Sequence, residues 1–102
     1  MSTLHTVNKS PFERSSLKTC LDHVMDGDAI VLLEDAVVGA RKGGAFVEAL
    51  SVKLASCDVF VLAPDLAARG IKDADIADGI ALVDYGGFVD LAVSKARVCA
   101  WL

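Results

Sequence analysis

Two short, unbroken runs of apolar residues constrain the fold of this chain more than any other feature. Residues 29–33 and 59–63 are apolar at every position and include β-branched side chains. A strand with one face in water alternates apolar and polar side chains, whereas a strand in a parallel sheet is covered on both faces and loses that alternation. Each run has five residues, far below the ~18 that a membrane-spanning helix needs. The runs therefore predict buried strands of a parallel sheet.

Helical patterns separate these strands along the chain. A first strand over residues 4–7 is followed by a helix over about 12–25, because Ser10 and Pro11 form a favourable helix entry. Further helices are expected at 45–54 and 85–95, short helical turns at 36–40 and 65–70, and strands at 79–83 and 97–101. Strands that alternate with helices are typical of α/β proteins. We expect residues 1–102 to form a single three-layer α/β domain with a mostly parallel sheet of about five strands, flanked by helices.

The composition excludes several classes of protein. Ten Lys and Arg residues against 14 Asp and Glu give a net charge of −4, which disfavours direct binding to nucleic acid. Hydrophobic residues make up 54% of the chain and charged residues 24%, so it is not disordered. The N-terminus lacks the basic and apolar regions of a signal peptide, and we expect a cytoplasmic protein that does not bind membranes. The mean hydropathy of +0.50 and the apolar residues 98–102 predict an oligomer subunit.

The residues that carry chemistry are few. Cys20, Cys57 and Cys99 are widely spaced, without a C-x-x-C motif, and only two histidines accompany them. This pattern predicts free thiols in a reducing compartment, with no metal site. Cys57 and Cys99 are expected to be small buried hydrophobic residues, and His5 a core or interface histidine with its hydrogen bonds satisfied.

Acidic residues follow the predicted strands, where ligands of open α/β sheets bind. Asp35, Asp65 and Asp84 each precede a helical segment, and the simplest expectation is that they cap these helices. Three carboxylates around one crevice would repel phosphate, so we expect no nucleotide or flavin cofactor.

Cys20 is the one cysteine whose position leaves its role open. In the predicted first helix it lies beside the apolar stripe of Leu17, Leu21 and Val24, with His23 three residues later. A thiol at the margin of an apolar face, next to an imidazole, is a candidate for partial exposure and for ionisation to thiolate. Packing in the core is the other interpretation, and spacing alone does not decide between them.

Four segments of the sequence together resemble a known family: residues 4–11 (LHTVNKSP), 27–35 (GDAIVLLED), 66–70 (LAARG) and 82–89 (LVDYGGFV), followed by the apolar end at Trp101. The chain resembles the DsrH/TusB family of the DsrE/DsrF/DsrH sulfur-relay superfamily over essentially its whole length. It looks closest to DsrH, because it carries a cysteine, Cys20, in the first helix.

The resemblance implies a heterohexamer with DsrE-like and DsrF-like subunits that passes persulfide sulfur to a DsrC/TusE-type acceptor. The principal persulfide cysteine of such complexes lies on the DsrE/TusD-like partner, so this chain need not be catalytic by itself. In oxidative sulfur metabolism the relay of the DsrH branch would use Cys20 as a second sulfur carrier. From its spacing to Cys20, we expect His23 to help hold the thiolate. In the TusB branch the relay leads to 2-thiolation of the wobble uridine of tRNA.

Three hypotheses remain open from the sequence. The chain is a sulfur-carrying subunit, or a structural subunit of a TusBCD-like complex whose cysteines are all buried, or a stand-alone signalling or small-ligand domain. Fast alkylation of a cysteine in the native complex would distinguish the first from the second. A soluble, monodisperse chain when expressed alone would favour the third.

Overall fold

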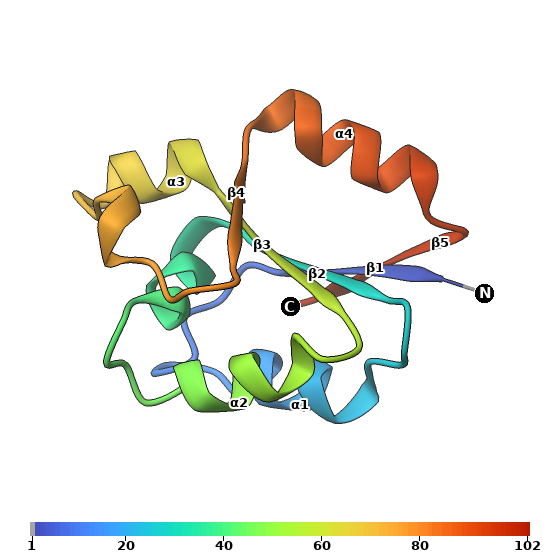
Figure 1. Ribbon diagram of the computed structural model, residues 1–102, viewed down its shortest axis with the longest axis horizontal. Helices are drawn as coiled ribbons and strands as arrows, with labels where there is room; N and C mark the ends of the chain where they lie inside the picture. The colour runs from blue at the N-terminus through green and yellow to red at the C-terminus, as the bar shows by residue number, and fades with distance from the viewer. Residues whose placement is uncertain (1) are drawn as a thin grey trace.

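The described part of the chain has five strands, which lie in one parallel sheet (Figure 1). The computed structural model describes residues 2–102. The elements in chain order are β1 (Thr3–Val7), α1 (Ser16–His23), β2 (Ala29–Leu32), the 3₁₀ helix η1 (Glu34–Ala40), α2 (Val47–Lys53), β3 (Asp58–Leu62), α3 (Ala63–Ala68), the 3₁₀ helix η2 (Asp73–Asp75), β4 (Ala81–Val83), α4 (Tyr85–Ser94) and β5 (Arg97–Trp101).

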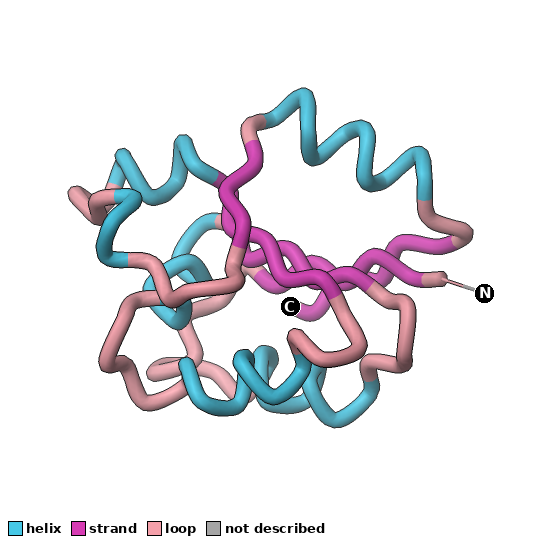
Figure 2. The backbone as a smooth tube through the Cα atoms, in the orientation of Figure 1, coloured by secondary structure: helices cyan, strands magenta, loops and turns pink. Residues whose placement is uncertain are grey.

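The strand order is β4-β3-β2-β1-β5, so the last strand crosses back over the sheet to pair with the first. The sheet is the middle of three layers: α1 and α2 lie on one side of it, and α4 lies on the other (Figure 2). The predicted three-layer α/β fold is confirmed, and the sheet is parallel throughout. None of the helices within residues 2–102 has the length and apolar character needed to cross a membrane.

The two faces of the sheet differ in how deeply they are buried. The main core lies between the sheet and the helices α1 and α2 and includes Leu17, Ile30 and Leu50, each 0% exposed. The core under α4 contains only three buried residues among those described, which are Leu4, Ala29 and Val31. Phe60, Phe88, Leu91 and other partly buried side chains complete that second cluster. The α4 side of the sheet is therefore thinly covered.

Element boundaries differ from the prediction where tertiary packing competes with local signals. The first helix begins at Ser16 and not near residue 12, and the segment before it forms turns. Pro11 is buried and lies so close to Gly39 that a side chain there would meet the proline ring at 3.1 Å. Packing of Pro11 against η1 thus takes the place of the expected first helical turns. The strand expected at 79–83 is shortened to Ala81–Val83.

Candidate functional site

Cys20 lies in the core of the protein. Its position on α1 turns the side chain toward the sheet, where it is 0% exposed and packs with Leu17 and Leu21. Burial raises the pKa of the Cys20 thiol from 9.0 to about 12, and the neighbouring Cys99, Asp28 and Cys57 add to the shift because a thiolate would be repelled by their negative charge. Of the two interpretations left open by the sequence, the structure agrees with packing of Cys20 in the core.

His23 does not serve as a partner of the Cys20 thiol. Its Nδ1 lies 2.7 Å from the carbonyl oxygen of Thr19, one turn earlier in α1, to which it donates a hydrogen bond. Its ring packs against Trp101, with 5.3 Å between ring centroids. Among residues 2–102, no hydrogen bond joins His23 to Cys20. The pairing expected from their spacing is absent, and the role of the two residues in sulfur transfer stays a prediction.

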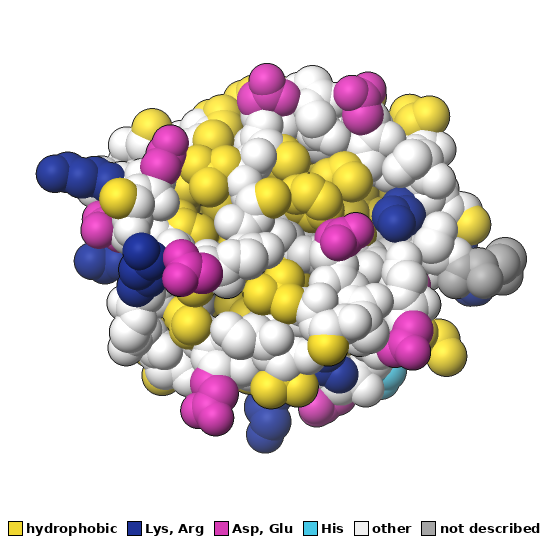
Figure 3. Space-filling view, in the orientation of Figure 1, with side chains coloured by type: hydrophobic (Ala, Val, Ile, Leu, Met, Phe, Trp, Pro, Cys, Tyr) yellow, Lys and Arg dark blue, Asp and Glu magenta, His cyan; other side chains and the backbone are white. Residues whose placement is uncertain are grey.

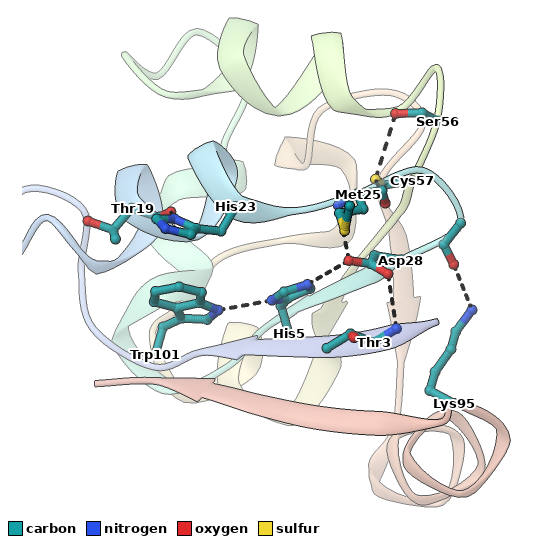
Figure 4. A network of polar contacts seen from close by, with 11 residues as sticks. Thr3, His5, Thr19, His23, Met25, Asp28, Ser56, Cys57, Lys95 and Trp101 are labelled. Carbon is teal, nitrogen blue, oxygen red and sulfur yellow. Dashed lines mark hydrogen bonds and ion pairs between the residues drawn. The ribbon is translucent and has the colours of Figure 1, made fainter. Parts of the chain in front are cut away.

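The structure instead builds a polar network from His5, Asp28 and Trp101 (Figure 4). The indole N–H of Trp101 lies 3.0 Å from Nδ1 of His5, and Nε2 of His5 lies 2.8 Å from Oδ2 of Asp28. Because an indole N–H only donates, Nδ1 of His5 accepts, and its proton resides on Nε2, which donates to Asp28. The expectation of a buried histidine with satisfied hydrogen bonds is confirmed, since His5 is 5% exposed.

Asp28 is the anchor of this network. Besides His5, it accepts hydrogen bonds from the backbone N–H groups of Thr3 and Met25, each at 3.0 Å. Burial raises the pKa of Asp28, but the hydrogen bonds from His5, Met25 and Thr3 outweigh burial and hold it below its ordinary value of 3.8. The network joins β1, the turn before β2 and the end of β5. Both ring nitrogens of His5 and both carboxylate oxygens of Asp28 have hydrogen-bond partners, so the network links these three parts of the fold.

The other two cysteines differ in exposure. Cys57 is 5% exposed, and its thiol donates to the carbonyl oxygen of Met25 at 3.2 Å, as expected for a packed cysteine. Cys99 is only half-buried, because β5 is an edge strand of the sheet. The expectation that Cys99 is buried is therefore wrong, and it is the least buried of the three cysteines.

Of the three aspartates expected to cap helices, only Asp84 does so. Its Oδ1 accepts from the backbone N–H of Gly87 at 2.7 Å, at the start of α4. Asp35 instead pairs with Arg69 at 2.7 Å. Asp65 accepts from the backbone N–H of Glu34 at 2.6 Å, and Glu34 is the one non-glycine residue within 2–102 with a positive φ, at 50°. No group of three or more potential metal ligands was found among the described residues.

The sequence reasoning missed Asp28 and Glu34. Asp28 stands directly before one predicted strand, and His5 lies within another. Because buried polar side chains are normally hydrogen-bonded, this placement is a weak signal that the two side chains pair with each other. The register that brings them together, in which β1 lies between β2 and β5, depends on the whole topology. The left-handed conformation of Glu34 has no sequence signal, because glycine or asparagine is the usual residue there.

Comparisons with known proteins agree with this structure. The family model described as "DsrH like protein" matches residues 9–98. A protein named TusB from Pectobacterium parmentieri is 42% identical over 99 residues, covering 96% of this chain and 99% of that protein. The TusB protein of Escherichia coli K12 is 36% identical over 98 residues, with the same coverage.

Solved structures share the fold at low sequence identity. The crystal structure of the ychN protein from E. coli superposes with a TM-score of 0.78 at 18% identity, covering 98% of this chain and 99% of that chain. Protein MTH1491 of Methanobacterium thermoautotrophicum, described as of unknown function, superposes with a TM-score of 0.74 at 13% identity, covering 94% and 96%. The structural likeness shows the fold, while the family model and the near full-length relatives show that this chain belongs to the DsrH/TusB family.

Proposed function

We propose that this chain is a structural subunit of a cytoplasmic, TusBCD-like sulfur-relay complex, which supports 2-thiolation of the wobble uridine of tRNA. The relatives named TusB, at 36–42% identity over nearly their whole length, support this branch of the family over the oxidative DsrEFH branch. The partners would be DsrE-like and DsrF-like subunits in a heterohexamer, together with a DsrC/TusE-type acceptor. The persulfide would form on the DsrE/TusD-like partner.

The burial of Cys20 is the observation that carries the structural role. Sulfur transfer needs a thiolate that the donor persulfide can reach. Cys20 is 0% exposed, and burial raises its pKa to about 12; both observations support a structural role over a sulfur-carrying one. His23 donates to a backbone carbonyl and does not hold a thiolate. A sulfur carrier on Cys20 would require α1 to separate from the sheet, which would disrupt the main core.

Complementation of tRNA thiolation tests this proposal. A bacterial strain without its own TusB would receive this chain together with its sister subunits, and 2-thiouridine would be measured by mass spectrometry of tRNA nucleosides. We expect the wild-type chain and Cys20→Ala to restore the modified nucleoside equally. Alanine is preferred to serine because serine would bury an unpaired hydroxyl.

Two results would contradict the proposal in different ways. If the wild-type chain restores no 2-thiouridine, the place in the tRNA relay is wrong. If the wild-type chain restores it but a folded Cys20→Ala variant does not, the chain carries sulfur and is not only structural. Thermal unfolding of the purified variant would establish that it is folded.

A further inference from the structure

The C-terminal part of the chain is apolar but leaves its side chains unburied. None of residues 81–102, which form β4, α4 and β5, is buried, whereas the preceding strands β2 and β3 are largely covered. In a monomer of this size, so large an apolar segment would normally contribute to the core. The segment thus has an apolar surface that its own chain does not cover.

On α4 this surface takes the form of a regular stripe. Tyr85, Val89 and Val93 follow each other at four-residue spacing and are 59%, 56% and 80% exposed. Side chains at this spacing share one face of a helix. Phe88 and Leu91 of the same helix instead pack against the core of the sheet. Figure 3 shows hydrophobic side chains gathered between α3, β4 and α4. We call the stripe and the cavity described next the α4 surface.

A cavity of about 280 Å³ lies at one end of the stripe, where the strands end. Tyr85 belongs to both the stripe and the cavity. The apolar part of the lining consists of Leu33, Leu62, Phe88 and the ring of Tyr85, and the polar part of Thr6, Glu34 and Asp65. No hydrogen bond of the Thr6 or Tyr85 hydroxyl occurs within residues 2–102. The cavity therefore combines apolar walls with two carboxylates and two free hydroxyl groups.

The charge around the cavity indicates what kind of partner fits it. Glu34 and Asp65 line it, and Asp84 stands beside Tyr85 at the start of α4. None of these three carboxylates has an ion-pair partner among the described residues. Burying them against another protein is favourable only if that protein supplies positive charge. The complementary group is a Lys or Arg side chain, whose aliphatic stem suits the apolar walls.

A second copy of this chain does not supply that group well. The positive residues next to α4 are Lys95 and Arg97, at the end of the helix away from the cavity, so only an antiparallel contact between two α4 helices would bring them to the cavity of the other copy. Lys95 already donates to the carbonyl oxygen of Gly27 at 3.3 Å. The chain as a whole has a net charge of −4, so two copies repel each other. A different polypeptide with a basic residue in an apolar face is the better occupant.

We propose that the α4 surface is where this chain binds a different subunit of its complex, and that the subunit inserts a Lys or Arg side chain into the cavity between Glu34 and Asp65. This inference rests on the proposed function, because it assumes that the chain works within a relay complex. It adds which surface makes the contact and what chemistry the partner presents there.

Two exposed valines on opposite faces of the sheet provide a matched test. Val93 on α4 is 80% exposed and Val52 on α2 is 68% exposed, so glutamate at either position leaves the core intact. The chain would be co-expressed with its DsrE-like and DsrF-like sister subunits, and the complex would be purified through a tag on a sister subunit. We expect Val93→Glu to reduce the recovered chain at least about 10-fold, and Val52→Glu to leave it unchanged.

The cavity is tested by removing its charge without changing its shape. In the double variant Glu34→Gln/Asp65→Asn, the amide oxygen at position 65 still accepts from the backbone N–H of residue 34. We expect binding to the sister subunits to weaken about 10-fold or more, as for other interface charge pairs, and to depend less on salt. The matched control is Asp22→Asn/Asp26→Asn, which removes two exposed carboxylates near α1.

The outcomes separate this inference from the proposed function. If the wild-type chain forms no complex with the sister subunits, the proposed function fails and the inference falls with it. If the wild-type chain forms the complex and Val93→Glu forms it equally well, the α4 surface is not the interface, but the proposed function stands. If Val93→Glu only abolishes self-association of the chain, the occupant is a second copy and the proposed partner chemistry is wrong.

Discussion

Asp28 is the residue on which three separate parts of the chain converge. It accepts hydrogen bonds from Thr3 of β1, from Met25 in the turn before β2, and from the ring of His5. His5 in turn accepts from Trp101 at the end of β5. Since Trp101 and the N-terminal strand are far apart in sequence, this network ties the two ends of the described chain to one buried carboxylate.

Replacing that carboxylate by an amide is expected to destabilise the protein. In Asp28→Asn the NH₂ group faces one of the present donors, so at least one charge-assisted hydrogen bond is lost. We expect the free energy of unfolding in urea to fall by about 1.5–3 kcal/mol, the range for hydrogen bonds to a buried charge. The control is Asp26→Asn, an exposed carboxylate two residues earlier. Equal stability of the two variants would show that the network contributes little.

The same residue predicts how stability depends on pH. The hydrogen bonds hold the pKa of Asp28 below 3.8 in the folded protein, so folding favours its charged form. The stabilisation is complete above the pKa of the unfolded chain and is lost as the pH falls through the lower pKa of the folded protein. We expect the stability difference between wild type and Asp28→Asn to be constant near pH 7 and to shrink below about pH 3.8. If the stability difference between wild type and Asp28→Asn grew on acidification, the lowered pKa of Asp28 would be contradicted.

Thiol alkylation should rank the three cysteines by exposure. With a pKa of about 12, roughly one Cys20 thiol in 10⁴ is ionised at pH 8, and the thiolate is the reactive form. We expect the folded chain to label first at Cys99, which is half-buried, and Cys20 and Cys57 to label only on unfolding. Peptide mass spectrometry after timed alkylation identifies the site, and Cys99→Ala should remove the fast phase. Rapid labelling of Cys20 in the native chain would contradict its burial.

At the scale of elements, α4 depends on its N-terminal cap more than a buried helix does. It has no fully buried residue, so packing stabilises it weakly, and Asp84 satisfies the backbone N–H of Gly87. We expect Asp84→Ala to lower the free energy of unfolding by about 1 kcal/mol, measured in urea. Asp84→Asn should retain most of the stability because its amide oxygen still accepts. Asp90→Ala, on an exposed position of the same helix, is the control and should have little effect.

Strands β2 and β3 were predictable from the sequence because residues 29–32 and 59–62 are apolar at every position, which is the pattern of a strand covered on both faces. Helix α1 was less predictable. Ser10 and Pro11 are a genuine helix-start signal, yet Pro11 packs against Gly39 and the helix begins at Ser16. A local signal of about 1 kcal/mol gives way when tertiary contacts bury the same residues.

The question that the sequence left open for Cys20 has a similar origin. On the helical wheel Cys20 lies at the flank of the apolar stripe, where both burial and partial exposure are compatible with the spacing. In the folded protein the end of β5 covers that flank: Ser16 donates to the carbonyl oxygen of Leu102 at 2.9 Å, and Trp101 packs against His23. Helical periodicity describes only residues of the same helix. It therefore could not predict the contact of α1 with the end of β5, more than 70 residues later in the chain.

The whole molecule is asymmetric, with a deep core on one side of the sheet and a thin one on the other. The mean hydropathy of +0.50 predicted surplus apolar surface, but only the topology shows where it lies. The chain returns from β4 to β5, at the opposite edge of the sheet, and α4 crosses one face on the way. The exposed side chains of α4, with the cavity at its start, form the α4 surface. A structural subunit of a larger complex is consistent with this distribution.

The most direct test of the structural role is the intact mass of each subunit in the reconstituted complex after treatment with a low-molecular-weight persulfide donor. The account predicts that the DsrE/TusD-like partner gains one sulfur atom. This chain should keep its mass, and Cys20→Ala should leave the loading of the partner unchanged. Addition of one sulfur atom to this chain in the wild-type complex, absent in Cys20→Ala, would contradict the account and make Cys20 a carrier.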